Sequence, residues 1–241
     1  YRVFHPLVSG ARLRLSTLAL ASLFASSGAA LAEDTPTEGE AVATVEEAPV
    51  AAPVRYALGQ GNLVVKVFKD ESTIASGISH NHAIQAKGWT GSFTWDAVAG
   101  TCAVEATVKV AQLDADSAAI RKWAGVAGDV DDGQREEIKT NLLKEDQLNG
   151  KKFPTITFKG DSCALAGDTL TIKGALTMRG RSKIVSIPLK GFSANETSLT
   201  GKGTFKVNHT DFGFQPFTAL FGALKNLDAM EFIIDLSGTA G

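Results

Sequence analysis

The chain has 241 residues, of which 44% are hydrophobic and 21% charged, and its formal net charge is −2. This composition favours a globular protein. Basic and acidic residues nearly balance after Val54, so the charge pattern gives no reason to expect a nucleic acid as the partner.

The first 32 residues are typical of an export signal. Arg12 and Arg14 precede an apolar run from Leu15 to Phe24, and small residues lead to the sequence Ala-Leu-Ala that ends at Ala32. A charged region, an apolar region and an A-x-A site predict a signal peptide over 1–32, cleaved after Ala32. The apolar run is short for a membrane span, so the mature chain is expected to be periplasmic or secreted, with no transmembrane segment.

The next segment differs in composition from everything that follows it. Residues 33–54 are acidic, rich in alanine and interrupted by prolines. Such a segment buries too little apolar surface to fold alone, so we expect a disordered linker over 33–54. The folded domain is then expected over 55–241.

Strand patterns dominate the folded domain. The run from Asp168 to Met178 alternates apolar and polar residues, as expected for a strand with one buried face. Several such runs are separated by turn residues, and eight antiparallel strands with short connections favour a closed barrel or a sandwich. The expected strands are Leu63–Lys69, Ala83–Asp96, Cys102–Leu113, Thr155–Leu165, Asp168–Met178, Ser182–Phe192, Leu199–Asn208 and Leu227–Ser237.

One segment lacks strand alternation. Within residues 114–149, Ser117 precedes one helical stretch, and Asp131 precedes a second in which Ile138 and Leu142 fall at helical spacing. Ser and Asp are favoured helix N-caps. We therefore expect one or two helices that cross over the end of the barrel.

The connection before the last strand is unusually rich in phenylalanine. Ordinary solvated loops carry few large apolar residues. The segment therefore predicts either a plug for the end of the barrel or the mouth of an apolar cavity. The candidate mouth residues are Phe212, Phe214, Phe217 and Phe221.

The chain has two cysteines, Cys102 and Cys163. An exported protein meets an oxidising compartment, which allows a disulfide between them. Their residue numbers differ in parity, however, and directly opposed residues on these two strands should share it. A bulge near Gly160 would repair the mismatch, so the pairing is left open.

The chain resembles the YceI-like family of exported polyisoprenoid-binding proteins over roughly residues 56–238. The resemblance rests on SGISHNHAIQAKGWTGSFTWD, LNGKKFPTITFKG, GALTMRGRSKIVSIPL and the ending from NHTDFGFQPF to EFIIDL. It implies an all-β fold, an eight-stranded antiparallel lipocalin-like barrel. It also implies a long isoprenoid or another amphiphilic lipid as ligand, with no catalysis and no other cofactor. A second histidine, His82, two residues after His80 is not expected in every member.

A lipid inside the barrel needs an apolar wall. Inward-facing positions of the expected strands supply candidates, and each of them could equally be ordinary core packing. The candidate wall residues are Val104, Val108, Ile156, Phe158, Leu170, Ile172, Leu176, Phe205, Met230, Phe232 and Ile234.

Two other functions are left open. His80 and His82 share one face of a strand, and with His209 they could hold a metal ion. Alternatively, the barrel is filled by its own side chains and serves a structural or stress-response role. A homodimer is also left open. The sequence from Gly77 to Asn81 lacks the final glycine of a nucleophile elbow, and no other motif indicates an enzyme.

Overall fold

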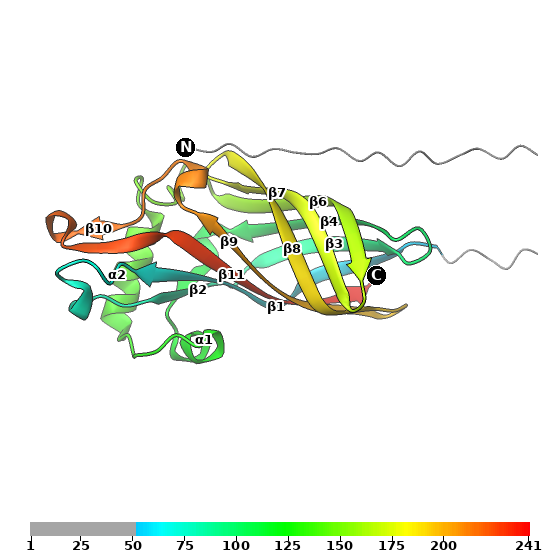
Figure 1. Cartoon of the computed structure of the whole chain (residues 1–241), viewed down its shortest axis with the longest axis horizontal. Helices are drawn as coiled ribbons and strands as arrows, with labels where there is room; N and C mark the ends of the chain where they lie inside the picture. Colours follow the sequence, from blue (N-terminus) through cyan, green and yellow to red (C-terminus); the bar gives the residue numbers. More distant parts are fainter. Residues whose placement is uncertain (1–51) are drawn as a thin grey trace, which may run out of the picture. The chain divides into compact units, whose positions relative to one another are not determined.

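The computed structural model describes residues 52–241, so the predicted signal peptide and the linker up to residue 51 lie outside the described residues. Eight antiparallel strands close into a barrel in the order β1-β3-β4-β6-β7-β8-β9-β11, with β11 returning to β1 (Figure 1). The predicted fold class is confirmed. The barrel strands are β1 (Val54–Lys69), β3 (Trp89–Asp96), β4 (Thr101–Lys109), β6 (Thr155–Ala166), β7 (Thr169–Met178), β8 (Arg181–Ala194), β9 (Ser198–Asn208) and β11 (Leu224–Ala240).

The alternation predicted for β7 is seen in its side chains. Leu170, Ile172, Leu176 and Met178 are buried in the interior, whereas Lys173 on the opposite face is exposed. Successive side chains of a strand point to opposite faces, so one apolar face per strand is enough to build the core. This pattern recurs around the barrel and makes its interior almost wholly apolar.

Two of the predicted strands are divided. The run Ala83–Asp96 forms β2 (His82–Ala86) and β3, with Lys87 and Gly88 between them. The run Cys102–Leu113 ends as a strand at Lys109, and a 3₁₀ turn then leads to β5 (Leu113–Ala115). The long strand β1 explains the first division, because its first half pairs with β3 and its second half pairs with β2.

Gly61 lies where β1 changes partner. Its φ is +88°, and an added Cβ would lie 2.0 Å from the carbonyl oxygen of Asp235 on β11. Only glycine tolerates both this conformation and this close approach. The register of β1 against β11 also shifts between Leu58 and Gln60, and a bulge of this kind bends the strand. After this bend, β1 pairs with β2 and β11 toward the end of the molecule that also carries β10 (Thr218–Ala219).

Both predicted helices are present. Helix α1 (Ala118–Ala124) follows Ser117, and α2 (Asp132–Leu143) begins with a capping box between Asp131 and Gln134. Apolar residues of α2 pack against the barrel core at its end, as predicted. Helix α1 instead packs outside the barrel, on β1 and β2. Neither helix is long and apolar enough to cross a membrane, a finding that covers residues 52–241.

A disulfide bond joins Cys102 on β4 to Cys163 on β6. The register of β6 against β7 shifts between Gly160 and Ser162, so Asp161 is an extra residue in β6. A bulge of this kind moves the following residues by one position and brings Cys163 opposite Cys102. The parity mismatch in the sequence is resolved at the place where a bulge was expected.

Candidate functional site

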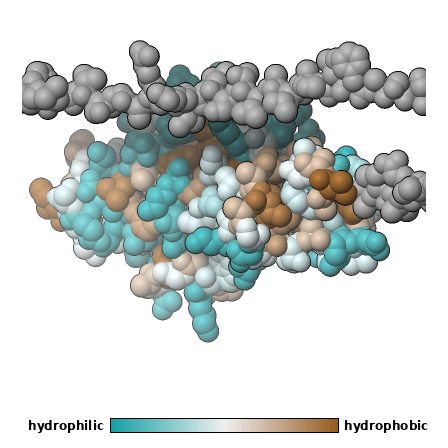
Figure 2. Space-filling model, turned by 45° about the vertical axis from the view of Figure 1, so that its right-hand side comes forward, coloured by the Kyte–Doolittle hydropathy of each residue, from teal (hydrophilic) through white to brown (hydrophobic). Residues whose placement is uncertain are grey.

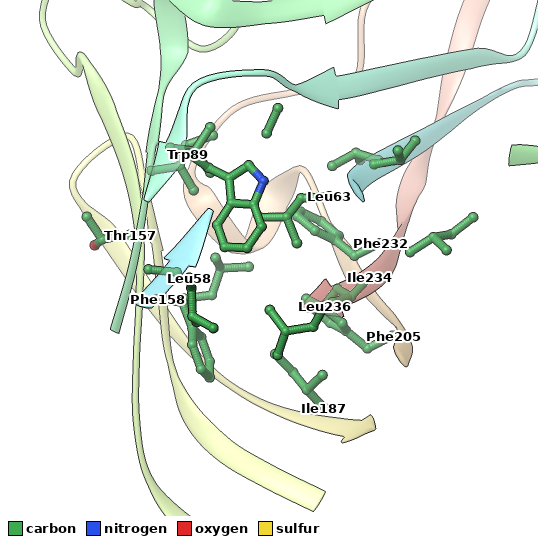
Figure 3. Close-up of a pocket in the computed structure, with 18 of the residues that line it drawn as sticks. Leu58, Leu63, Trp89, Thr157, Phe158, Ile187, Phe205, Phe232, Ile234 and Leu236 are labelled. Atoms are coloured by element: carbon green, nitrogen blue, oxygen red, sulfur yellow. The ribbon is translucent and has the colours of Figure 1, made fainter. Parts of the chain in front are cut away.

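The barrel encloses an apolar cavity of about 130 Å³. Figure 3 shows the side chains of Trp89, Phe158, Phe205 and Phe232 pointing into it from different strands, with Thr157 at its margin. Phe205 and Phe232 stack with their ring centroids 4.8 Å apart. None of the residues that line this cavity is charged, so it can accommodate hydrocarbon and little else.

Most of the predicted wall residues line the cavity, and two do not. Leu170 and Met230 are buried in the core elsewhere in the barrel. The predicted residues that line it are Val104, Val108, Ile156, Phe158, Ile172, Leu176, Phe205, Phe232 and Ile234.

Sequence reasoning missed several lining residues on β1, β2, β3 and β8. Trp89 lies four positions before Phe93, so the two side chains share the inward face of β3. This spacing could have identified Trp89 from the sequence. Leu58 and Leu63 lie on either side of the bend in β1, where simple alternation fails. Ile187 on β8 follows the same alternation as the lining residues of the other strands.

The four predicted mouth phenylalanines have different environments. Phe212 and Phe214 are buried and plug the end of the barrel. Phe217 lines a second cavity, which we call the polar cavity because five of its ten lining residues are polar, although most of its wall is apolar. Phe221 lines neither cavity and is fully exposed. The segment therefore combines a plug, a cavity wall and an exposed loop.

The polar cavity has a volume of about 90 Å³. It lies at the end of the barrel under α2, which contributes Ile138, Asn141 and Leu142. Ile84 lines this cavity and the apolar one, so the two cavities are neighbours. The polar groups in the wall of this cavity belong to His82, Asn141, Gln147, His209 and Asn226.

Asn226 stands out within this polar cavity. Its residue is 7% exposed, and its Oδ1 has no hydrogen-bond partner within residues 52–241. An unsatisfied buried amide oxygen is costly. A ligand with a polar end could satisfy it.

A buried polar network holds His82 in place. Asp116 is fully buried, and its carboxylate accepts hydrogen bonds from His82 Nδ1 at 2.7 Å, from the Ala83 amide at 2.8 Å and from Arg121 at 2.7 Å. Arg121 also donates to the carbonyl oxygen of Asn81 at 2.8 Å. These bonds fix the start of β2 against α1, and thereby the ring of His82 in the wall of the polar cavity.

The buried groups of this region have shifted pKa values. Burial alone would raise the pKa of Asp116, but the hydrogen bonds from His82, Ala83 and Arg121 and the charge of His82 outweigh it and lower the pKa. Burial lowers the pKa of His209, despite the opposing effect of Asp228. The Nδ1 of His209 donates a hydrogen bond to the carbonyl oxygen of Asp228 at 2.7 Å.

The structure brings together only part of the alternative metal site. His82 and His209 line the same cavity, whereas His80 does not. Burial and the nearby charges of His82 and Arg121 lower the pKa of His80. Within residues 52–241, no three His, Cys, Asp or Glu side chains are grouped as metal ligands.

Most of the barrel matches a known domain family. The model of the YceI-like domain matches residues 66–237. The chain belongs to the YceI-like family. Its barrel and the sequence segments that suggested the resemblance are thereby explained together, and the predicted family is confirmed. Among curated proteins, none matches this chain.

Solved structures agree with the YceI-like fold. The crystal structure of Burkholderia cenocepacia BcnA matches with a TM-score of 0.51 and 16% identity, over 73% of this chain and 95% of that chain. A polyisoprenoid binding domain from Saccharophagus degradans, implicated in plant cell wall breakdown, matches with a TM-score of 0.50 and 8% identity, over 78% of this chain and 99% of that chain. At these identities the likeness shows the fold alone.

Proposed function

We propose that this YceI-like protein is exported and binds an amphiphilic lipid, of which a long-chain isoprenoid is the best candidate, inside its barrel. The observation that carries the proposal is the apolar cavity, whose wall is hydrocarbon apart from Thr157 and the indole nitrogen of Trp89. Burial of apolar chain contributes about 0.8 kcal/mol per methylene group, so such a wall retains a hydrocarbon tail without any charged contact. The solved polyisoprenoid binding domain of the same fold supports the choice of ligand.

The neighbouring polar cavity suits the polar end of the same ligand. Only Ile84 is shared between the two cavities, so a ligand that passes this side chain has its tail in the apolar cavity and its head beside His82, His209 and Asn226. The unsatisfied oxygen of Asn226 would gain a hydrogen bond from such a head. Binding of an amphiphile uses both cavities, whereas a pure hydrocarbon uses one.

The size of the apolar cavity bears on how a long chain enters. A cavity of about 150 Å³ is known to accept one benzene molecule, so 130 Å³ holds only a short part of a long isoprenoid. A longer chain must displace wall side chains, and the stacked pair Phe205 and Phe232 is in the way. Affinity should therefore rise with chain length until the displacement of these rings costs more than further burial contributes.

We propose binding rather than catalysis. Within residues 52–241, the pair of His82 with Asp116 is the nearest arrangement to a catalytic dyad, but that carboxylate is fully buried and also pairs with Arg121. A buried carboxylate needs a partner of opposite charge, so the ion pair with Arg121 is typical of a structural network. A metal-binding barrel and a barrel without any ligand are the two alternatives, and lipid extraction with metal analysis distinguishes them.

The test is mass spectrometry of an organic extract of the purified protein, followed by titration with polyprenols of several lengths. Ala106 lines the cavity, and Ala103 lies on the opposite, exposed face of the same strand. The variant Ala106→Phe should lose bound lipid and weaken polyprenol binding at least about tenfold, because the added ring fills space needed by the tail. Its matched control Ala103→Phe should behave as wild type. An empty extract without polyprenol binding would overturn the proposal, and stoichiometric zinc in the purified protein would favour the metal alternative.

A further inference from the structure

Two loops at one end of the barrel hold large apolar side chains in solvent. One loop joins β1 to β2 (residues 70–81), and the other joins β10 to β11. Their exposed fractions are 97% for Ile74, 69% for Ile78, 58% for Leu220 and 113% for Phe221. We call these four residues the apolar tip. Figure 1 shows both loops at the same end of the barrel, and hydrophobic atoms project at that end in Figure 2.

Hydrogen bonds between the two loops make the apolar tip one unit. The amide of Ala75 donates to the carbonyl oxygen of Ala223 at 2.9 Å, and the amide of Asp70 donates to the carbonyl oxygen of Lys225 at 2.8 Å. Within the first loop, Ile78 ends a 3₁₀ turn that begins at Ser76. The four side chains are thus presented together by a connected backbone.

The backbone of the second loop is unusual for the residues it carries. Leu220 has a φ of +51° and Phe221 a φ of +54°, and neither is a glycine. Asparagine is enriched in this left-handed region, whereas large apolar residues are rare in it. Two bulky side chains are therefore held in an unfavourable conformation at a place where they contact no core. An outlier of this kind motivates the hypothesis that these side chains have a function.

The size and form of the apolar tip fit a lipid bilayer better than a protein. An aromatic side chain buries roughly 150–250 Å², and three of the four tip residues are smaller aliphatic ones. Four residues near the lower figure offer about 600 Å², which is less than the roughly 800 Å² per partner of a standard protein interface. The tip projects from two loops (Figure 1), and its four residues line neither of the two cavities. Projecting Phe, Leu and Ile side chains enter the boundary between headgroups and acyl chains without needing a complementary surface.

The apolar tip is also continuous with the polar cavity. Phe217 and Asn226 lie at the two ends of the loop that carries Leu220 and Phe221, and both line that cavity. The backbone amide of Asn226 donates to the carbonyl oxygen of Phe217 at 3.0 Å, and this bond closes the base of the loop. We propose that the apolar tip docks the barrel on the surface of a lipid bilayer. Docking would bring the polar cavity to the bilayer, and it does not depend on which ligand the barrel binds.

The test places a tryptophan at the apolar tip of the full chain and measures its depth in vesicles. The variants are Phe221→Trp and a matched control, Val98→Trp, which changes a residue with 65% exposure in the loop at the opposite end of the barrel. Vesicles of phosphatidylethanolamine and phosphatidylglycerol carry bromine on the acyl chains, which quenches tryptophan fluorescence at short range. We expect the fluorescence of Phe221→Trp to shift to the blue and to be quenched, whereas the added fluorescence of Val98→Trp is unchanged.

A second set of variants separates insertion of the apolar tip from nonspecific adsorption and from self-association. In the Phe221→Trp background, Ile74→Asn with Leu220→Asn should reduce the apparent vesicle affinity about tenfold or more, since two apolar anchors are removed and Asn tolerates the backbone of residue 220. Equal quenching at positions 221 and 98, or none at either, would overturn the proposal. Ultracentrifugation without lipid tests for self-association. A concentration-dependent dimer of the wild type that is lost in the Leu220→Asn and Phe221→Asn variants would also overturn the proposal, because the tip would then be a contact between copies of the chain.

Discussion

Asp116 accepts a hydrogen bond from His82 across 2.7 Å, although its own backbone adopts a left-handed conformation with a φ of +53°. Its backbone amide donates to the carbonyl oxygen of Ala83 at 2.9 Å, while its carboxylate accepts from the amide of the same residue. Asp116 therefore clamps β2 from both its backbone and its side chain. The clamp positions His82 in the polar cavity and α1 on the outer face of the barrel.

Replacing Asp116 by Asn tests the clamp. Asn tolerates the left-handed backbone, so the change removes chiefly the negative charge that Arg121 needs. Loss of one partner of a buried ion pair is expected to lower the free energy of unfolding by about 3 kcal/mol, measured by urea denaturation. Asp132→Asn, at a side chain with 95% exposure, is the control and should change little. Equal stability of Asp116→Asn and wild type would contradict the clamp.

His209 makes the stability of the protein depend on pH. Its pKa is lower in the folded protein than in the unfolded chain, because burial disfavours the imidazolium. The unfolded chain therefore binds more protons, and the stabilisation present above about pH 6.5 is lost as the pH falls toward the folded pKa. The urea midpoint of the wild type should drop through this window.

The urea midpoint of the variant His209→Gln should fall less steeply with decreasing pH over the same range. His80 also has a lowered pKa and adds to the wild-type slope, so the difference between wild type and His209→Gln isolates the contribution of His209. Asp228 lies 4.0 Å from His209 and opposes the effect without reversing it. Parallel pH profiles for the two proteins would show that His209 does not titrate in this window.

The sequence predicts the barrel better than it predicts the cavities. Alternation along a strand is a local property, and it identifies the inward face of β7 and nine of the cavity-lining side chains. Leu170 on β7 and Met230 on β11 are buried in the same core, yet they line neither of the two cavities. Depth along the barrel axis decides between core and cavity wall, and a two-residue period carries no information on it.

The polar cavity depends on contacts between distant segments. His209 directly follows β9, and it reaches His82 through the pairing of β9 with β11, of β11 with β1 and of β1 with β2. Asn226 joins them from the start of β11. The clamp at Asp116 could not be predicted, because its left-handed backbone and its partner Arg121 have no local pattern in the sequence. The division of the run Ala83–Asp96 could not be predicted for the same reason, since the bend in β1 decides it.

The disulfide between Cys102 and Cys163 should contribute strongly to stability. It closes a loop with a sequence separation of 61 residues. The entropy of the unfolded chain then predicts a loss of about 4 kcal/mol when both cysteines are replaced by serine. Urea denaturation measures the loss, and a thiol assay on the protein purified without reductant from an oxidising compartment should find no free cysteine. Two free thiols in that protein would contradict the bond.

Gly61 should be essential for closing the barrel between β1 and β11. An added Cβ would approach the Asp235 carbonyl oxygen to 2.0 Å, whereas at Gly100, with a φ of +65°, an added Cβ meets nothing within 4 Å. Both substitutions to alanine incur the cost of a positive φ, roughly 1–2 kcal/mol. Only Gly61→Ala also forces the two strands apart, so it should lose at least about 2 kcal/mol more than Gly100→Ala in urea denaturation. Hydrogen exchange should then show weaker protection at the amides that pair β1 with β11 near Leu236. If the two variants lose the same free energy of unfolding, β1 and β11 move apart easily enough to accommodate the added methyl group. The bend in β1 would then not depend on this close approach.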